Sequence, residues 1–452
     1  MTEIQWNKLG AYLKETQILG SIQNTLYWDQ NTGMPKKGAS WRSEQLTYIA
    51  KILHKRNSSE EFYNLIQSAK NELLDTKQNS NNQLFIKGKE RNINLLIKEF
   101  NRAKNLDPKL VESLAKAKSK GYESWQEAKK KSDFKVFLPF FEELVKLRIE
   151  EAKQISDQYS PWETLAQPFE PELTLKWLNK IFQPLKDTLP ELIRGINNSK
   201  KYHWDLSPES QQNLCSKLLD ELGRDKDLVV VGKSPHPFSI TLGPNDYRIT
   251  TRIVEGEPLS SFLATAHEWG HSIYEQGLPS QSHQWFAWPL GQATSMGIHE
   301  SQSLFWENRI VKSKSFSKRF FKKFVSAGCT LNNYFELWKS INHLEAGLNR
   351  VEADELTYGL HILVRTELEI DLIEGGLPAE DIPEEWNKRY GELLGIKPSN
   401  DSEGCLQDVH WSEGAFGYFP SYLLGHLISA QISSQMERDI GLIDDLIQNG
   451  EY

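Results

Sequence analysis

Apolar residues recur at every third or fourth position along almost the whole of this 452-residue chain, and this spacing restricts the fold most strongly. Leu9, Tyr12 and Leu13 begin the first such pattern, and Gly33 with Pro35 mark the end of its helix. We therefore expect a mainly α-helical protein, well above the usual helical share of about one third. The same spacing predicts further helices over 39–74, 82–104, 108–131, 133–158, 172–198, 207–221, 258–277, 290–312, 315–340, 350–374, 383–395 and 418–447.

One stretch of the chain departs from the helical spacing. Residues 228–231, 238–242 and 247–252 alternate in polarity or are β-branched, and glycine and proline residues separate them. This pattern predicts two or three short strands in a small sheet. The sheet would lie directly before the predicted helix 258–277.

Two pairs of residues that contain proline mark expected helix boundaries. Asp107-Pro108 predicts the start of a helix, and Ser160-Pro161 predicts the end of the one before it. No internal repeat or long linker divides the chain. We therefore expect a single domain over residues 1–452.

The composition excludes several classes of protein. Hydrophobic residues make up 38% of the chain and charged residues 25%, which is ordinary for a globular protein and not for a disordered one. The net charge of −8 argues against a nucleic-acid partner. No run of about 18 apolar residues and no signal-peptide pattern is present, so we expect no membrane partner. Cys215, Cys329 and Cys405 lie far apart and fit a reducing compartment, and we expect a cytoplasmic protein.

The segment from Ala266 to His271 is the most informative motif, because it reads HExxH. On a helix, His267 and His271 share one face about 5–6 Å apart and could bind one metal ion. Zinc in such a site lowers the pKa of a bound water to about 7, and Glu268 could take the proton as a general base. Gly270 costs the helix about 1 kcal/mol relative to alanine, so we expect a close neighbour or the metal beside it. A pair of hydrogen-bonded core histidines is the competing interpretation.

A hydrolytic zinc site needs a third protein ligand. The metzincin motif would place a histidine at position 277, but Gly277 stands there. A glutamate from a later helix is the alternative, and Glu300 is our choice. Glu275 and Glu307 are its competitors, and either could instead hold a ligand histidine in place. We expect His299 to be structural.

Several separated segments together resemble the carboxypeptidase Taq family of thermostable metallocarboxypeptidases. The resemblance covers nearly the whole chain, and the motifs follow one another in the family's order. They are the opening motif from Trp28 to Pro35 with Arg42, His236-Pro237-Phe238, DxRxT from Asp246 to Thr250, HExxH at 267–271, HESQ from His299 to Gln302, and QDxHW from Gln407 to Trp411.

The resemblance implies a largely helical peptidase fold with lobes on either side of a deep groove, related to neurolysin-like and angiotensin-converting-enzyme-like peptidases. The small sheet would lie beside the active-site helix. The resemblance also implies one divalent metal per chain, usually Zn²⁺ with Co²⁺ able to substitute, and a homodimer. It implies removal of single C-terminal residues with broad specificity, and it supports Glu300 as the third ligand.

The loop 281–288 is a few residues longer than the connection that the family usually has between its two metal motifs. It adds aromatic residues near the expected site, so substrate preference could differ from that of the family. It also adds His283, which could compete for the metal.

A carboxypeptidase must bind a free C-terminal carboxylate, and arginine can do so through two hydrogen bonds. Arg248 lies in the predicted sheet before the HExxH helix. Arg350 lies in a segment between two predicted helices. Either arginine could contact the substrate, and either could instead form a structural ion pair.

The remaining candidate residues are assigned by analogy with related peptidases. His410 and the aromatic segment 417–422 follow the two metal motifs, so we expect His410 and Tyr418 to stabilise the oxyanion, with Tyr422 in reserve. An aromatic helix face packed into the core is the competing interpretation for the tyrosines. The other substrate-binding candidates come from the family motifs and are His236, Asp246, Thr250 and Gln302.

Together these residues predict a zinc carboxypeptidase that acts on short peptides, with Glu268 as the general base. An oligopeptidase or a dipeptidyl carboxypeptidase on the same fold is the alternative. A peptide-binding protein without activity is a further alternative. Against it, the four residues that would hold metal and activate water are all present: His267, Glu268, His271 and Glu300.

Overall fold

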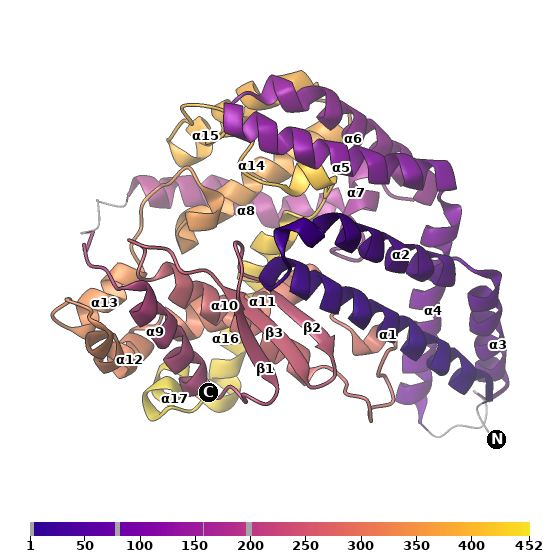
Figure 1. Cartoon of the computed structure of the whole chain (residues 1–452), viewed down its shortest axis with the longest axis horizontal. Helices are drawn as coiled ribbons and strands as arrows, with labels where there is room; N and C mark the ends of the chain where they lie inside the picture. Colours follow the sequence, from indigo (N-terminus) through magenta and orange to yellow (C-terminus); the bar gives the residue numbers. More distant parts are fainter. Residues whose placement is uncertain (1–3, 77–81, 157, 196–200) are drawn as a thin grey trace.

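The structure is a computed structural model of the chain, and it describes residues 4–76, 82–156, 158–195 and 201–452. It is mainly helical, as the apolar spacing predicts, with a small sheet in its lower half (Figure 1). The α-helices are α1 (Ile4–Thr32), α2 (Ala39–Asn57), α3 (Glu60–Thr76), α4 (Gln83–Asn105), α5 (Pro108–Lys131), α6 (Phe134–Ile155), α7 (Pro161–Ala166), α8 (Leu175–Arg194), α9 (Pro208–Glu221), α10 (Ser260–Gly277), α11 (Met296–Leu304), α12 (Lys314–Ala327), α13 (Tyr334–Ile341), α14 (Glu355–Ile373), α15 (Ile382–Leu394), α16 (Pro420–Ile440) and α17 (Ile443–Asn449).

Some predicted helices are divided into two in the structure. The predicted helix 39–74 forms α2 and α3, because the Ser59 hydroxyl accepts a hydrogen bond from the Phe62 backbone N–H and begins a new helix. The predicted helix 315–340 is interrupted at Gly328, whose φ of +109° ends α12.

Two more predicted helices have different limits in the structure. The helix predicted over 418–447 forms α16 and α17, separated at Gly441 with a φ of +98°. In the segment 290–312, α11 begins only at Met296 and continues into η4 (Phe305–Val311), a π-helix. Residue 157 and residues 196–198, which belong to two other predicted helices, lie outside the described residues.

The helix before Ser160-Pro161 does end ahead of this pair, since α6 ends at Ile155. Ser160 also begins the short helix α7, which the sequence did not predict. Its hydroxyl accepts from the Glu163 backbone N–H, and the Glu163 carboxylate accepts from the Ser160 N–H. This reciprocal pair is a capping box, and proline suits the first position of the helix that follows.

The predicted sheet is present and has three strands, β1 (Val229–Lys233), β2 (Ser239–Gly243) and β3 (Asp246–Thr251). Their spatial order is β1-β3-β2, with β1 parallel and β2 antiparallel to the central β3. Helix α10 follows β3 in the chain and packs against β2 and β3. The sheet therefore supports the helix that carries the HExxH motif, as expected.

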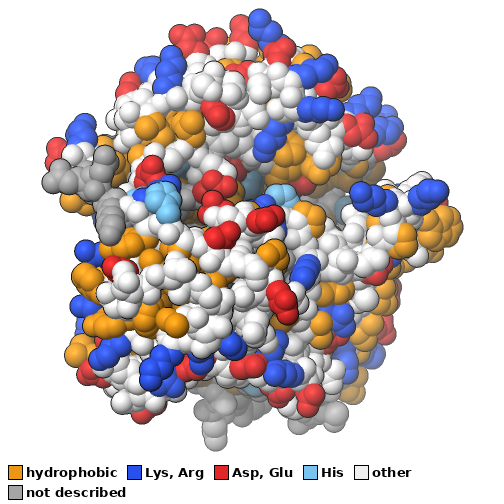
Figure 2. Space-filling view, turned by 60° about the vertical axis from the view of Figure 1, so that its left-hand side comes forward, with side chains coloured by type: hydrophobic (Ala, Val, Ile, Leu, Met, Phe, Trp, Pro, Cys, Tyr) orange, Lys and Arg blue, Asp and Glu red, His pale blue; other side chains and the backbone are white. Residues whose placement is uncertain are grey.

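Two large groups of buried apolar side chains form the halves of the molecule. The first, here called the upper cluster, comes from α6, α7, α8, α14, α15 and the segment 405–424. The second, the lower cluster, comes from α9, the sheet, α10, η4, α12, α13 and α17. Figure 2 shows a groove between the two halves of the molecule, with histidine side chains along it.

A third, smaller cluster joins the N-terminal helices α1, α3 and α4 at one side of the molecule. Trp6 and Trp288 stack there with ring centroids 3.8 Å apart. Leu9 and Ile66 are completely buried in the same group. Among the described residues, no helix combines the length and the apolar character that crossing a membrane requires.

Candidate active site

Helix α10 places its two histidines together because its other side is anchored in the lower cluster. Phe262, Ala266 and Trp269 are buried there. His267 and His271, one turn apart, are turned toward α11 instead, and their ring centroids lie 4.9 Å apart. The apolar spacing of the sequence thus determines which side of the helix holds the histidines.

Gly270 allows α10 and α11 to approach closely. A Cβ atom at this position would lie 2.5 Å from Ser303 Cα and 2.6 Å from the Gln302 carbonyl oxygen. Both neighbours are backbone atoms, which cannot move aside easily. The close neighbour expected from the sequence is therefore the backbone of α11.

Helix α11 is fixed at its start by a buried carboxylate. Glu170 accepts a hydrogen bond of 2.5 Å from the Gly297 backbone N–H and one of 2.7 Å from the Ser421 hydroxyl. Burial raises the pKa of Glu170, while these hydrogen bonds lower it. Gly425 of α16 lies against Glu300, since a Cβ there would be 2.7 Å from Glu300 Cγ. Helices α11 and α16 therefore confine Glu300 closely.

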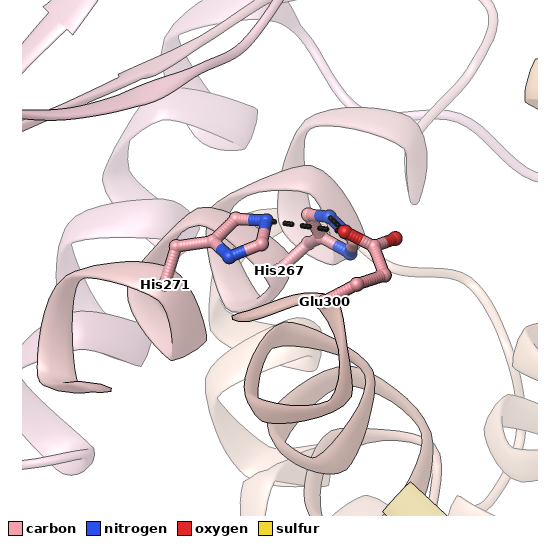
Figure 3. Close-up of side chains that lie close together, drawn as sticks. All are labelled: His267, His271 and Glu300. Carbon is pink, nitrogen blue, oxygen red and sulfur yellow. Dashed lines mark ion pairs between the residues drawn. The ribbon is translucent and has the colours of Figure 1, made fainter. Parts of the chain in front are cut away.

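The structure brings His267, His271 and Glu300 together, with one potential ligand atom of each within 4.8 Å of the others. Glu300 Oε2 lies 3.4 Å from His271 Nε2 and 3.8 Å from His267 Nε2. Figure 3 shows the three side chains converging from two helices. Ligands about 2.0–2.2 Å from a tetrahedral Zn²⁺ are separated by about 3.4 Å, so this donor set fits the ion.

His267 is held on its far side by a carboxylate. Its Nδ1 lies 3.0 Å from Glu307 Oε2, and Lys312 Nζ lies 2.7 Å from the other Glu307 oxygen. Burial lowers the pKa of His267, but Glu300 and Glu307 outweigh this and raise it to about 10. Glu307 thus has the supporting role that the sequence left open for it.

His271 is held differently, because its Nδ1 meets a second imidazole. The Nδ1 atoms of His271 and His299 lie 2.7 Å apart, and His299 Nε2 lies 2.9 Å from Glu275 Oε1. Burial lowers the pKa of His271 to about 4. Burial raises the pKa of Glu300, but the two histidines lower it by more than this, so that the pKa falls to about 2.

Glu268 lies beside the three candidate ligands and is buried, with 7% of its surface exposed. Burial raises its pKa to about 7, and the carboxylates of Glu300 and Glu307 add to the rise, while His267 lowers it. A bound divalent cation would lower this pKa again. A carboxylate in this position could accept a proton from a water molecule on the ion.

The upper half contributes His410 and a group of tyrosines. His410, at the start of η7 (His410–Glu413), has Nε2 3.1 Å from the Tyr422 hydroxyl, and its ring stacks on Tyr418 at 5.6 Å. Burial lowers the pKa of His410 to about 4. Burial, with the charge of Glu300, raises the pKa of Tyr418 to about 12. Both side chains are therefore neutral at pH 7.

Arg350, in η5 (Arg350–Glu352), is bound by a carboxylate of the QDxHW motif. Its Nε and Nη2 donate to Asp408 Oδ1 at 2.9 and 2.8 Å, and its Nη1 donates to the Tyr358 hydroxyl at 3.1 Å. Asp408 also accepts from Arg365 Nε at 2.6 Å. Two guanidinium groups therefore share one carboxylate, and the arginine cations lower its pKa far below the usual range. Arg350 lies beside the tyrosines, with Cζ 5.1 Å from the Tyr422 ring centroid.

Arg248 forms a two-point ion pair within the sheet. Its Nε and Nη2 donate to the two Asp246 oxygens at 2.8 and 3.1 Å. The Arg248 guanidinium also lies 5.5 Å from the Trp28 ring. Both candidate arginines thus have the ion pair that the sequence allowed.

The other predicted residues lie on the central strand β3, in the loop before β2 and on α11. The buried Thr250 hydroxyl accepts from the Phe238 N–H at 2.9 Å and lies 2.6 Å from the Ser234 hydroxyl. These contacts fix the loop that carries the exposed His236. Gln302 of α11 donates to the Ser301 hydroxyl at 3.1 Å.

Comparison with known proteins agrees with this arrangement. Residues 8–452 match the family described as Carboxypeptidase Taq (M32) metallopeptidase. The chain belongs to this family. It is 34% identical to Thermostable carboxypeptidase 1 of Thermus thermophilus, over all of this chain and 90% of the relative, and 34% identical to Carboxypeptidase 1 of Bacillus subtilis, over 94% of this chain and 85% of the relative. The solved structure of Trypanosoma Cruzi Metallocarboxypeptidase 1 has a TM-score of 0.92 at 31% identity and covers 100% of this chain and 90% of that chain.

Membership in the carboxypeptidase Taq family has direct consequences. The protein is a metallocarboxypeptidase, a hydrolase of peptide bonds. It therefore uses a metal ion, and His267, His271 and Glu300 are a candidate site for it. The helical peptidase fold expected from the resemblance is confirmed by the structural neighbours.

The two tryptophans of the loop 281–288 pack against the N-terminal helices. Trp288 is buried in the third cluster, stacked on Trp6, and Trp285 packs on Gly88 of α4. The loop therefore anchors the N-terminal helices. His283 accepts from the Trp285 N–H at 3.1 Å and is not part of the ligand group found among the described residues.

Sequence reasoning missed several residues around the site. Glu369 accepts from Trp411 Nε1 at 2.8 Å and from the Gly417 N–H at 2.9 Å, which fixes both ends of the segment between His410 and Tyr418. Burial raises the pKa of Glu369 to about 7. Its only sequence signal was a charged residue inside the apolar stripe of a predicted helix. Glu170 and Arg365 gave no stronger signal, since their partners lie far away in the chain.

Proposed function

We propose that this protein is a metal-dependent carboxypeptidase that removes single C-terminal residues from short peptides with broad specificity. The observation that carries the proposal is the convergence of His267, His271 and Glu300, with Glu268 beside them, in a chain of the carboxypeptidase Taq family. We further propose Zn²⁺ as the metal, with Co²⁺ able to substitute. Bound Zn²⁺ would lower the pKa of a water molecule to about 7 and polarise the peptide carbonyl.

The residues of the chain have separate tasks in this proposal. Glu268 accepts the proton of the attacking water and returns it to the leaving amine, a task that suits a buried carboxylate next to the ligand histidine His267. His410 and Tyr418 donate hydrogen bonds to the oxyanion, with Tyr422 in reserve. Their neutral state at pH 7 supports this role, because each keeps an N–H or O–H to donate.

Arg350 is the better candidate for the substrate carboxylate. Arg350 and Arg365 share the single carboxylate of Asp408, so one positive charge of this group lacks a matching carboxylate among the ion pairs of the described residues. The charge of Arg248 is balanced by its two-point pair with Asp246. A peptide C-terminus beside Arg350 would supply the missing negative charge. Arg248 remains the second candidate.

Further parts of the proposal concern the surroundings of the site. His236, Asp246, Thr250 and Gln302 would form the walls of the substrate groove.

We also propose that the chain is one domain and that it forms a homodimer in the cytoplasm. Its partners in this proposal are peptides, and neither nucleic acids nor membranes. The absence of a membrane-crossing helix among the described residues is compatible with this location.

Mass spectrometry of a digested peptide tests the proposal directly. A peptide of five to eight residues is incubated with the Zn²⁺-loaded protein, beside a copy with an amidated C-terminus. We expect successive single-residue losses from the free acid and no cleavage of the amide, because a carboxylate is needed for binding. Internal cuts or dipeptide losses in both copies would instead identify an oligopeptidase or a dipeptidyl carboxypeptidase and would remove the role given to Arg350.

A further inference from the structure

The two histidines of the metal site are supported by different groups. Glu307 contacts Nδ1 of His267 directly at 3.0 Å. Among the described residues, no carboxylate takes the corresponding place beside Nδ1 of His271. Its Nδ1 instead lies 2.7 Å from His299 Nδ1, and only the far side of His299 meets a carboxylate, Glu275.

The protons of this chain of contacts can be assigned from chemistry. A histidine that presents Nε2 to a metal is neutral and carries its proton on Nδ1. The Nδ1–H of His271 therefore points at His299 and needs an acceptor there. His299 can accept on Nδ1 only if its own proton is on Nε2, and that atom lies 2.9 Å from Glu275 Oε1. Glu275 thus selects the tautomer of His299, and His299 selects the tautomer of His271.

The two supporting residues are themselves held by the fold. His299 is on α11, one residue before the ligand Glu300, and its ring meets the edge of Tyr274 at a centroid distance of 5.4 Å. Glu275 is on α10, and its second oxygen accepts from the Thr241 hydroxyl of β2 at 3.3 Å. The contacts therefore run from α10 through α11 and back to the last turn of α10, beside the sheet.

We propose that His299 and Glu275 are positioning residues that hold His271 in the tautomer and orientation needed to bind the metal. The proposal rests on the metal site proposed above. It gives His299 a part in metal binding without contact with the ion. Support of this kind changes metal affinity by about 10- to 100-fold in known sites.

Metal affinity in single and double variants tests whether the two residues act in series. Dissociation constants for Zn²⁺ are measured by competition with a chromophoric chelator for His299→Ala, Glu275→Gln and the double variant. We expect His299→Ala to weaken binding by about 10- to 100-fold. Glu275→Gln should weaken it less, because an amide oxygen can still accept from His299. The double variant should equal His299→Ala, since Glu275 acts only through His299.

A spectroscopic readout separates positioning from a general structural role. In the Co²⁺-loaded protein, the visible absorption bands of the ion report ligand geometry, and we expect them to shift in His299→Ala and Glu275→Gln. The thermal midpoint of the metal-free variants should stay close to that of the wild type. His283→Ala is the matched control, because His283 is an exposed loop histidine that accepts a hydrogen bond from the Trp285 N–H. It should change neither affinity nor spectrum.

Three results would overturn the proposal. The first is wild-type affinity with an unchanged Co²⁺ spectrum in Glu275→Gln, a result that can be obtained even if His299→Ala does not fold. The second is a double variant in which the effects of the two substitutions multiply. The third is a loss of affinity accompanied by a large loss of metal-free stability. Failure of the metal site itself would look different. In that case His271→Ala would also bind Zn²⁺ as tightly as the wild type.

Discussion

Burial determines the charge of the side chains around the metal site. His410 and Tyr418 lie side by side in the upper half, and burial moves their pKa values in opposite directions, to about 4 and about 12. Each residue is consequently neutral over the range in which peptidases are usually assayed. Neutral donors fit a site that must accept a negative oxygen without first losing a proton.

Replacement of Tyr418 by phenylalanine tests the role of its hydroxyl group. We expect kcat to fall by about 10²–10³-fold, the usual cost of one oxyanion donor, with little change in metal affinity. Because the raised pKa keeps the phenol protonated below about pH 12, the ratio of wild-type to variant kcat should be constant from pH 6 to pH 10. A ratio that shrinks above pH 9 in steady-state assays would show that the phenol titrates in its ordinary range.

Residues that act through local spacing could be predicted from the sequence. His267 and His271 are four residues apart on one helix, so their convergence follows from helical geometry alone. The partners of Arg350 could not be found in this way, because Asp408 is 58 residues away in the chain. Asp408 belongs to a motif that the sequence showed, but only the packing of the upper half reveals its two arginines.

At the scale of secondary structure, close helix packing at two glycines positions the three candidate ligands. Gly270 brings the backbones of α10 and α11 together, and Gly425 brings α16 against Glu300. The existence of these helices follows from apolar spacing. Their limits depend on capping: the Ser59 hydroxyl begins α3 inside a segment predicted as one helix, and the Ser160 hydroxyl begins α7.

Substitution of Gly270 by alanine tests this packing. The new Cβ would meet backbone atoms of α11 at 2.5 and 2.6 Å, so we expect the free energy of unfolding to fall by about 1–3 kcal/mol and Zn²⁺ affinity to fall with it. Gly277→Ala on the same helix is the control, since no atom lies within 4 Å of its Cβ position. It should be neutral or stabilise by up to about 1 kcal/mol. Equal denaturation curves for the two variants would contradict the account.

At the scale of the whole molecule, the site lies where the two halves meet. The lower cluster supports the histidines of α10, and the upper cluster supports His410 and Tyr418. Figure 2 shows the groove between these halves. The sequence predicted both the mainly helical fold and the sheet beside α10. It could not predict that Trp288 packs on Trp6, because aromatic residues give no sign of whether they line a groove or fill a core.

Removal of the metal should weaken the whole fold. An ion that binds the folded state at 1,000 times its dissociation constant stabilises that state by about 4.1 kcal/mol. We therefore expect a chelator to lower the thermal midpoint, and added Zn²⁺ to restore it, in differential scanning fluorimetry. His271→Ala should show no such response. An identical midpoint with and without chelator in the wild type would mean that the ion is not part of the folded protein.

The most direct test of the central claim is the activity of Glu268→Gln. Glutamine keeps the shape of the side chain but cannot accept the proton of water. We predict that the variant binds one metal ion per chain with the affinity of the wild type and loses about 10²–10⁴-fold in kcat on a free-acid peptide. Full activity in the metal-loaded variant would contradict the mechanism, because the carboxylate beside the three ligands would then have no part in the reaction.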